Sequence, residues 1–176
     1  MRIFPFQPSS SPKEAPIISQ SHLNVAGAMS VRSVAFHTTM PDLLAFSTLS
    51  SGDVSLVKIS PDHQSVSPLL LLKSFNTTVT VLRWFPDSMI LAIGMTNGEV
   101  SVFYLSEDLE IKRILNFLAH KSSKPSDDFG SLDIQAEVWS LDWRAKDSSQ
   151  LATVSEDQSM KIWKIEGDSA TEIMKV

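Results

Sequence analysis

The 176-residue chain contains no cysteine. This absence excludes disulfides, thiolate metal sites and a cysteine nucleophile. Positive charge is also scarce, because 15 Lys and Arg residues stand against 20 Asp and Glu residues and give a formal net charge of -5. Such a chain has no surplus of basic side chains to neutralise phosphates. The composition therefore argues against direct nucleic-acid binding.

Long hydrophobic runs are missing as well. Runs such as Leu69–Leu72 are far shorter than the roughly 20 residues needed to span a membrane. Prolines interrupt the N-terminal residues, so these do not form the apolar stretch of a signal peptide. We predict that residues 1–28 are a Pro/Ser-rich, largely disordered lead-in, in which the apolar Ile3–Phe6 is suited to docking. We assign residues 29–176 to the folded domain.

Sequence motifs of catalysis are absent too. The chain has neither a G-x-S-x-G elbow nor a glycine-rich phosphate loop. Its four histidines have irregular spacing, which favours structural or solvent-facing roles over zinc binding. Adjacent carboxylates fall in predicted loops, where solvated charge is the favoured interpretation. We therefore predict no enzymatic activity, cofactor or metal. The carboxylate pairs are Glu107–Asp108, Asp127–Asp128 and Glu156–Asp157.

What the chain does contain is a threefold internal repeat, at residues 31–60, 79–106 and 138–166. Each unit begins with a valine and has an aromatic residue five positions later. The units start further apart than the about 40 to 45 residues of common four-stranded repeats, which indicates inserted connections. The aligned pairs are Val31 and Phe36, Val79 and Trp84, and Val138 and Trp143.

Each unit alternates apolar and polar residues with a period of two, which predicts strands. In the third unit this alternation places Trp139 with Leu141 and Trp143 on one face, opposite Val138. Asn97–Gly98 is the strongest hairpin signal, because both residues tolerate positive φ. We predict four antiparallel strands per unit. The fourth strands are expected at Val66–Phe75, Ile111–Leu118 and Glu172–Val176.

The repeat resembles the WD-repeat β-propeller family, whose blades are four-stranded sheets with a Trp-Asp dipeptide at the end of the third strand. Trp163–Lys164, Phe103–Tyr104 and Val57–Lys58 take the dipeptide position here, so the Asp is missing throughout. The resemblance implies an all-β fold with blades at about 31–75, 79–120 and 138–176. Propellers use about four to eight blades, so three blades imply an incomplete ring with two apolar faces exposed.

The resemblance also implies a buried hydrogen-bond set in the third blade. Its members would be His120, Thr153 or alternatively Ser155, Asp157 and Trp163. Asp157 would then be a hydrogen-bond acceptor that holds the turn before the third strand against the side of the blade that carries the Trp163 indole. His120 lies unusually far before the third unit, so residues 121–136 are expected to form an inserted loop. The other two units have Ser51 and Asn97 in place of the Asp and lack the Trp.

Trp139 is the leading candidate for a partner contact. It aligns with Arg32 and Thr80 near the rim where the family commonly places such contacts, and Glu156 is expected beside it. A tryptophan next to a charge is typical of an interaction hot spot. The alternative is that Trp139 packs between adjacent blades. Phe129 in the inserted loop is a further candidate.

The resemblance implies a non-catalytic scaffold or adaptor in a eukaryotic multiprotein complex of the cytoplasm, the nucleus or both. Its partners would be other protein subunits, one of which would complete the propeller. Two alternatives remain open, because the fold alone does not decide function. One is an accessory subunit of a ubiquitin ligase, methyltransferase or RNA-processing enzyme. The other is a structural component of trafficking coats.

Overall fold

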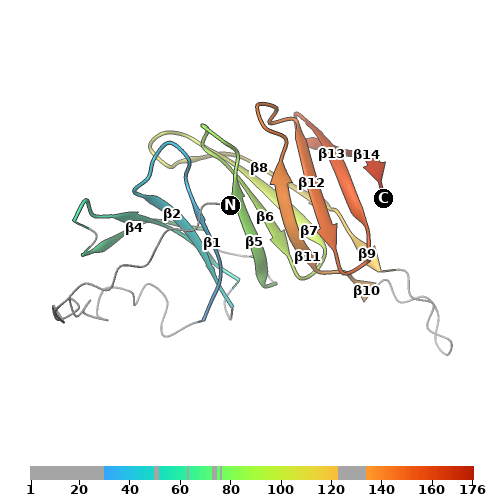
Figure 1. Cartoon of the computed structure of the whole chain (residues 1–176), viewed down its shortest axis with the longest axis horizontal. Coiled ribbons are helices and arrows are strands. Elements are labelled where there is room, and N and C mark those ends of the chain that lie inside the picture. The colour runs from blue at the N-terminus through green and yellow to red at the C-terminus, as the bar shows by residue number, and fades with distance from the viewer. Residues whose placement is uncertain (1–29, 50–51, 63, 73–74, 76, 123–133) are drawn as a thin grey trace, which may run out of the picture.

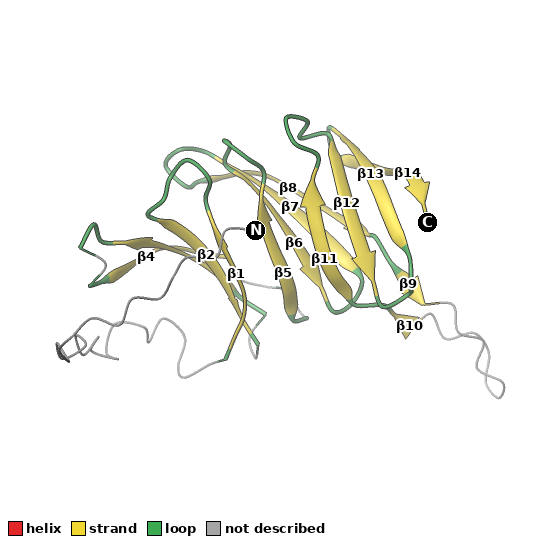
Figure 2. Ribbon diagram, in the orientation of Figure 1, coloured by secondary structure: helices red, strands yellow, loops and turns green. Residues whose placement is uncertain are grey.

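The computed structural model describes residues 30–49, 52–62, 64–72, 75, 77–122 and 134–176. The predicted lead-in at 1–28 and the candidate residue Phe129 lie outside these residues. The described residues form strands and turns without a helix, and most strands belong to three antiparallel sheets (Figures 1 and 2). The prediction of an all-β fold made of four-stranded blades is confirmed.

The three sheets follow one another along the chain, and we call them blades 1, 2 and 3. Each blade pairs its strands in sequence order. Blade 1 contains β1 (Val31–Phe36), β2 (Leu43–Thr48), β3 (Val54–Ile59) and β4 (Val66–Leu72). Blade 2 contains β5 (Val79–Trp84), β6 (Ile90–Met95), β7 (Glu99–Leu105) and β8 (Ile111–Leu118). Blade 3 contains β11 (Val138–Trp143), β12 (Gln150–Ser155), β13 (Met160–Glu166) and β14 (Ser169–Lys175).

The insertion before blade 3 is joined at its base by a short ladder. In this ladder β9 (Lys121–Ser122) pairs antiparallel with β10 (Ile134–Gln135). The two ends of the insertion therefore lie side by side, and the chain enters blade 3 next to the point at which it left blade 2.

The blades pack face to face in an arc that does not close, with blade 1 at one end and blade 3 at the other (Figure 1). One apolar core fills the space between blades 1 and 2, and a second fills the space between blades 2 and 3. Blade 2 is therefore covered on both faces, and its inner strands β6 and β7 are buried along most of their length rather than at alternate residues. The first strand of blade 2, β5, lies between the first strands of the other two blades and contacts both β1 and β11.

The same hydrogen bond recurs at both junctions between blades. The indole Nε1 of Trp84 donates to the carbonyl of Ala35 at 3.2 Å, and that of Trp143 donates to the carbonyl of Arg83 at 3.3 Å. In both cases the later blade supplies the donor. These bonds satisfy the polar end of a large buried side chain.

His37 adds a further link between blades 1 and 2. It is buried, and its Nε2 lies 3.1 Å from the carbonyl of Ser88. Its Nδ1 accepts the backbone N–H groups of Thr39 and Met40, so Nε2 carries the proton. The ring also packs edge-on against Trp84, with the two ring centroids 5.0 Å apart. Of the two roles expected for histidines, His37 has the structural one.

Every first strand has a bulge at its second residue. The register shifts between Val31 and Ser33 in β1, and at the aligned positions of β5 and β11. A bulge adds one residue to a strand, so the side chains before and after it no longer follow one strict alternation between the two faces of the sheet. The predicted face of Trp139 is therefore wrong: Val138 is buried with Leu141 and Trp143, whereas Trp139 is exposed.

The hairpin predicted at Asn97–Gly98 is confirmed, since it joins β6 to β7, but its turn geometry and the start of the last strand differ from the predictions. Of the residues in the Asn97–Gly98 turn only Gly98 has positive φ, and its N–H bonds the carbonyl of Met95 at 3.2 Å. The Asn97 side chain instead accepts the N–H of Glu99, so the turn is a three-residue loop with a glycine bulge. The last strand begins at Ser169, earlier than the predicted Glu172, because Gly167 already makes the turn.

Candidate interaction site

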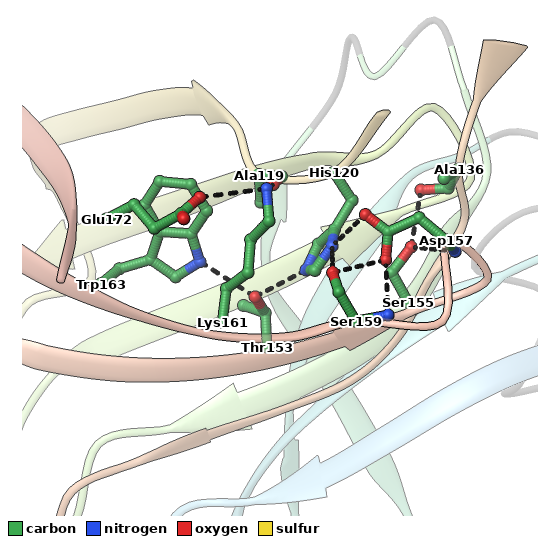
Figure 3. Close-up of polar contacts among 10 residues, drawn as sticks. All are labelled: Ala119, His120, Ala136, Thr153, Ser155, Asp157, Ser159, Lys161, Trp163 and Glu172. Carbon is green, nitrogen blue, oxygen red and sulfur yellow. Dashed lines mark hydrogen bonds and ion pairs between the residues drawn. The ribbon is translucent and has the colours of Figure 1, made fainter. Parts of the chain in front are cut away.

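A chain of hydrogen bonds runs through blade 3 and joins four residues. His120, which follows β8, is fully buried, and its Nδ1 lies 2.9 Å from Oδ2 of Asp157. Its Nε2 lies 2.7 Å from the hydroxyl of Thr153, which also accepts the indole N–H of Trp163 at 2.9 Å (Figure 3). The connection from blade 2 is thereby tied to β12, to β13 and to the turn between them.

The proton positions in this chain follow from its acceptors. An ionised Asp157 only accepts, so Nδ1 of His120 carries the hydrogen and Nε2 accepts from the hydroxyl of Thr153. Ser159 donates both its backbone N–H and its hydroxyl to the other oxygen of Asp157, at 2.9 and 2.7 Å. Ser155, the alternative to Thr153, points elsewhere and donates to the carbonyl of Ala136.

The environment keeps His120 neutral and Asp157 ionised. Burial lowers the pKa of His120 and outweighs the opposing effect of Asp157. Burial acts to raise the pKa of Asp157, but the hydrogen bonds from Ser159 and His120 together outweigh it and the pKa lies below its usual value. A satisfied, buried pair of this kind stabilises the blade.

The equivalent position in blade 2 has only local contacts. Asn97, which stands where Asp157 does in blade 3, bonds the side chain and the backbone of Glu99. Ser51 in blade 1 lies outside the described residues.

A second group of predicted residues gathers around Glu137. Arg32 reaches from blade 1 to form an ion pair with Glu137, with Nη2 and Oε1 2.7 Å apart. The backbone N–H of Glu156 donates to the carbonyl of Glu137 at 3.0 Å. Trp139 follows two residues later, and it is 57% exposed on the bulge of β11. We call Arg32, Glu137, Trp139 and Glu156 the rim patch.

Exposure separates the candidates for partner contacts. Trp139 is 57% exposed and does not pack between the described blades. The alternative, that it packs against an adjacent blade, stays a prediction, because the aligned Thr80 is buried where the next blade covers it. Thr80 is buried, and its hydroxyl lies within hydrogen-bond distance of the carbonyls of Gly94 and Val138. Its proposed role as a partner contact is therefore wrong, because blade 3 covers this bulge.

Glu137 was missed by the sequence analysis. It lies 105 residues from its partner Arg32, and no local pattern links the two. Its only sequence signal is a charge of opposite sign immediately before the third unit.

Within the described part of the chain, no three His, Asp or Glu side chains are arranged to hold a metal ion. None of these residues forms a helix of the length and hydropathy that a membrane span requires.

The fold defines the class of protein: these are WD40-like β-propeller blades in an unclosed ring. The structure is similar to the WD40 domain of Toxoplasma gondii coronin, with a TM-score of 0.62 and 19% identity over 85% of this chain. It is also similar to Chaetomium thermophilum Sqt1, solved with the N-terminus of ribosomal protein L10, with a TM-score of 0.59 and 18% identity over 82% of this chain.

The sequence itself has fewer matches. No family model matches the chain. An uncharacterised protein of Clostridium acetobutylicum is 26% identical over 109 residues, which are 58% of this chain and 26% of that protein. The chain spans 34% and 33% of the two solved structures.

Proposed function

We propose that this protein is a non-catalytic interaction module whose rim patch binds a segment of another protein. The observation that carries the proposal is the exposed indole of Trp139, held on a hydrogen-bonded strand. Exposed tryptophans on rigid supports are frequent hot spots of protein interfaces. WD40-like folds are typically non-catalytic, which agrees with this role.

The charges of the patch favour a basic partner. The side chain of Glu156 is exposed, and that of Glu137 forms an ion pair with Arg32. A Lys or Arg side chain of a partner can lie over the indole face of Trp139 and pair with Glu156. The net charge of -5 would also attract such a segment from a distance. In a similar fold, Sqt1 is bound to the N-terminus of a ribosomal protein.

The proposal includes a wider setting. The module would act as a scaffold or adaptor in a eukaryotic multiprotein complex, in the cytoplasm, the nucleus or both. Protein partners are supported by the complex that Sqt1 makes, and by the two apolar faces that the unclosed arc leaves exposed.

A peptide-binding experiment tests the rim patch. The protein is applied to an array of extended peptides that vary in Lys and Arg content, and Trp139→Ala, Glu156→Gln and Leu69→Ala are compared. Leu69 is 44% exposed on β4 and serves as the matched apolar control. We expect Trp139→Ala to abolish binding, Glu156→Gln to weaken binding of basic peptides, and Leu69→Ala to leave it unchanged.

Thermal unfolding of the same variants separates binding from folding. Trp139→Ala should unfold cooperatively with a melting temperature close to that of the wild type, since a mostly exposed side chain contributes little to stability. If it loses cooperative unfolding, Trp139 belongs to the core and the proposed site is wrong. Equal binding by Trp139→Ala and the wild type would also contradict the proposal.

A further inference from the structure

Blade 3 encloses a lysine side chain where it meets blade 2. The side chain of Lys161 on β13 is only 13% exposed. Its Nζ donates to the carbonyl of Ala119 at 2.8 Å and forms an ion pair with Oε2 of Glu172 at 3.1 Å (Figure 3). The same nitrogen lies 5.4 Å from the centroid of the Trp163 ring. A carbonyl, a carboxylate and an aromatic face together replace the water that a buried ammonium group loses.

The aligned position in blade 2 has a serine. Strand register aligns Ser101 on β7 with Lys161 on β13, and Phe103 with Trp163. Ser101 is buried, and its hydroxyl donates to Oδ1 of Asn116 at 2.7 Å. A serine side chain is too short to fill the space that the four-carbon chain of a lysine takes.

A cavity of about 560 Å³ lies at this place between blades 1 and 2. Its walls come from the end of β4 and the segment after it on one side, and from β7 and β8 on the other. The volume is within the range of about 300–1,000 Å³ that is usual for ligand sites. The residues that line it include Leu71, Phe75, Glu99, Ser101, Phe103 and Ile114.

Two aromatic rings form part of the wall. Phe75 and Phe103 pack edge to face, with centroids 5.8 Å apart and planes at 83°. The face of an aromatic ring is electron-rich and attracts a cation. Because Phe103 takes the place of Trp163, over which Lys161 lies in blade 3, the cavity keeps the aromatic part of an ammonium site.

The cavity also has a carboxylate, although from a different position. Ile114 takes the place of Glu172 in the strand register, so the acidic partner of the lysine in blade 3 has no counterpart there. Glu99 lines the cavity instead, two residues before Ser101 on the same strand. Its Oε2 accepts a hydrogen bond from Nδ2 of Asn97 at 2.8 Å. This donor is neutral, so the carboxylate keeps a negative charge that attracts a cation.

We propose that this cavity binds the side chain of a lysine from a partner protein. The hydrocarbon chain would pack against Leu71 and Ile114, and the ammonium group would lie against the ring of Phe103 and pair with Glu99. Lys161 makes the same kinds of contact within the protein itself. The inference does not rest on the rim patch, because none of the four residues of that patch lines the cavity. Failure at one site therefore leaves the other untouched.

Nuclear magnetic resonance of the full, isotope-labelled chain tests the site. The probe is a capped peptide with one lysine between glycines, and the matched control has norleucine, which keeps the four-carbon chain and lacks the ammonium group. We expect the lysine peptide to shift the backbone amide signals of β7 and β8 saturably, and the norleucine peptide to bind at least about fivefold more weakly. Pentylammonium, a small amine without a peptide backbone, should bind no more tightly than the lysine peptide.

Three variants locate the binding. Glu99→Gln should weaken the lysine peptide by about two- to fivefold, whereas Glu107→Gln, also exposed in blade 2, should not. Ser101→Lys should abolish binding, because its own ammonium group fills the cavity and can reach Glu99. Trp139→Ala should bind the lysine peptide as the wild type does. Thermal unfolding of each variant confirms that it is folded, and Glu99→Gln decides the matter if Ser101→Lys does not fold.

Four results would overturn the proposal. The absence of a saturable shift would show that the cavity binds no lysine, and equal binding of the norleucine peptide would show that it selects apolar chains. Unchanged binding by folded Ser101→Lys or by Glu99→Gln would place the peptide elsewhere. Tighter binding of pentylammonium than of the peptide would assign the cavity to small amines instead of a partner protein.

Discussion

The hydroxyl of Thr153 connects two buried ring nitrogens on opposite sides of it. It accepts from Trp163 and donates to His120. Thr153→Val keeps the shape but leaves both nitrogens without this partner in a buried site, which costs about 1–3 kcal/mol for each group. We expect the free energy of unfolding, measured in urea, to fall by about 2–4 kcal/mol.

An exposed threonine provides the comparison. Thr171→Val on β14 should change stability by less than about 0.5 kcal/mol. Equal effects at the two positions would show that the hydrogen-bonded chain does not stabilise blade 3.

The neutral His120 predicts how stability depends on pH. Its pKa is lower in the folded state than the ordinary value of 6.5, so between these two values the unfolded chain binds more protons. Stability is therefore full above pH 6.5 and decreases as the pH falls below it. Urea unfolding between about pH 7.5 and about pH 5.5 should show this decrease.

Replacement of the titrating ring tests the origin of that effect. His120→Gln should be less stable at neutral pH, but its stability should depend less on pH over this range. The same slope in both proteins would assign the pH dependence to other groups.

At this scale the members of the hydrogen-bonded chain were predictable, because the third unit has the residue types that the WD-repeat resemblance implies at these positions, whereas the first two units lack them. The sequence did not predict the pairing of Arg32 with Glu137 or of His37 with Ser88. Both contacts join residues of different blades that are far apart in the sequence. Their geometry depends on how the sheets pack, which no local pattern records.

A bulge at its second residue distinguishes the first strand of each blade. The valines that open the three repeats are the first residues of β1, β5 and β11. Period-two alternation misassigned Trp139, since the extra residue of a bulge is paired with no partner and leaves no mark on the pattern of apolar residues. Sequence periodicity therefore predicts where a strand lies more securely than which way each of its side chains points.

The β6–β7 hairpin yields a prediction about a single methyl group. Gly98 has a φ of 78°, and a Cβ there would lie 2.1 Å from the carbonyl oxygen of His120. Gly98→Ala must therefore displace the strand connection that carries His120. We expect a loss of more than about 2 kcal/mol in urea unfolding.

Gly167 offers a matched control for backbone strain. Its φ is 55°, and an added methyl group would meet no atom within 4 Å, so Gly167→Ala introduces strain without a clash. Its cost should stay near about 1 kcal/mol. If both variants lose the same stability, the close approach to His120 is unimportant.

For the whole molecule, burial of blade 2 on both faces predicts uneven stability. Backbone amides of β6 and β7 should exchange with solvent most slowly, and those of β4 and β14 most rapidly, because the end blades each have one open face. Hydrogen exchange followed by mass spectrometry measures this difference. Uniform protection across the three blades would contradict it.

The unclosed arc was predictable from the count of repeats, since each repeat makes one blade and three blades do not complete a ring. Which face of one blade packs against which face of the next was not predictable from the repeats. It depends on the direction of the indole hydrogen bonds, which is set by how the packed blades place Trp84 and Trp143 beside their acceptors.

That direction has a consequence for recombination between repeats. The donor of each junction is a side chain of the incoming blade, whereas the acceptor is a main-chain carbonyl that every residue possesses. A duplicated or transplanted blade therefore brings the specific half of its junction with it, and the receiving blade needs no matching change at that position. Lineages that shuffle such units are free to vary the accepting residue, as Ala35 and Arg83 already do.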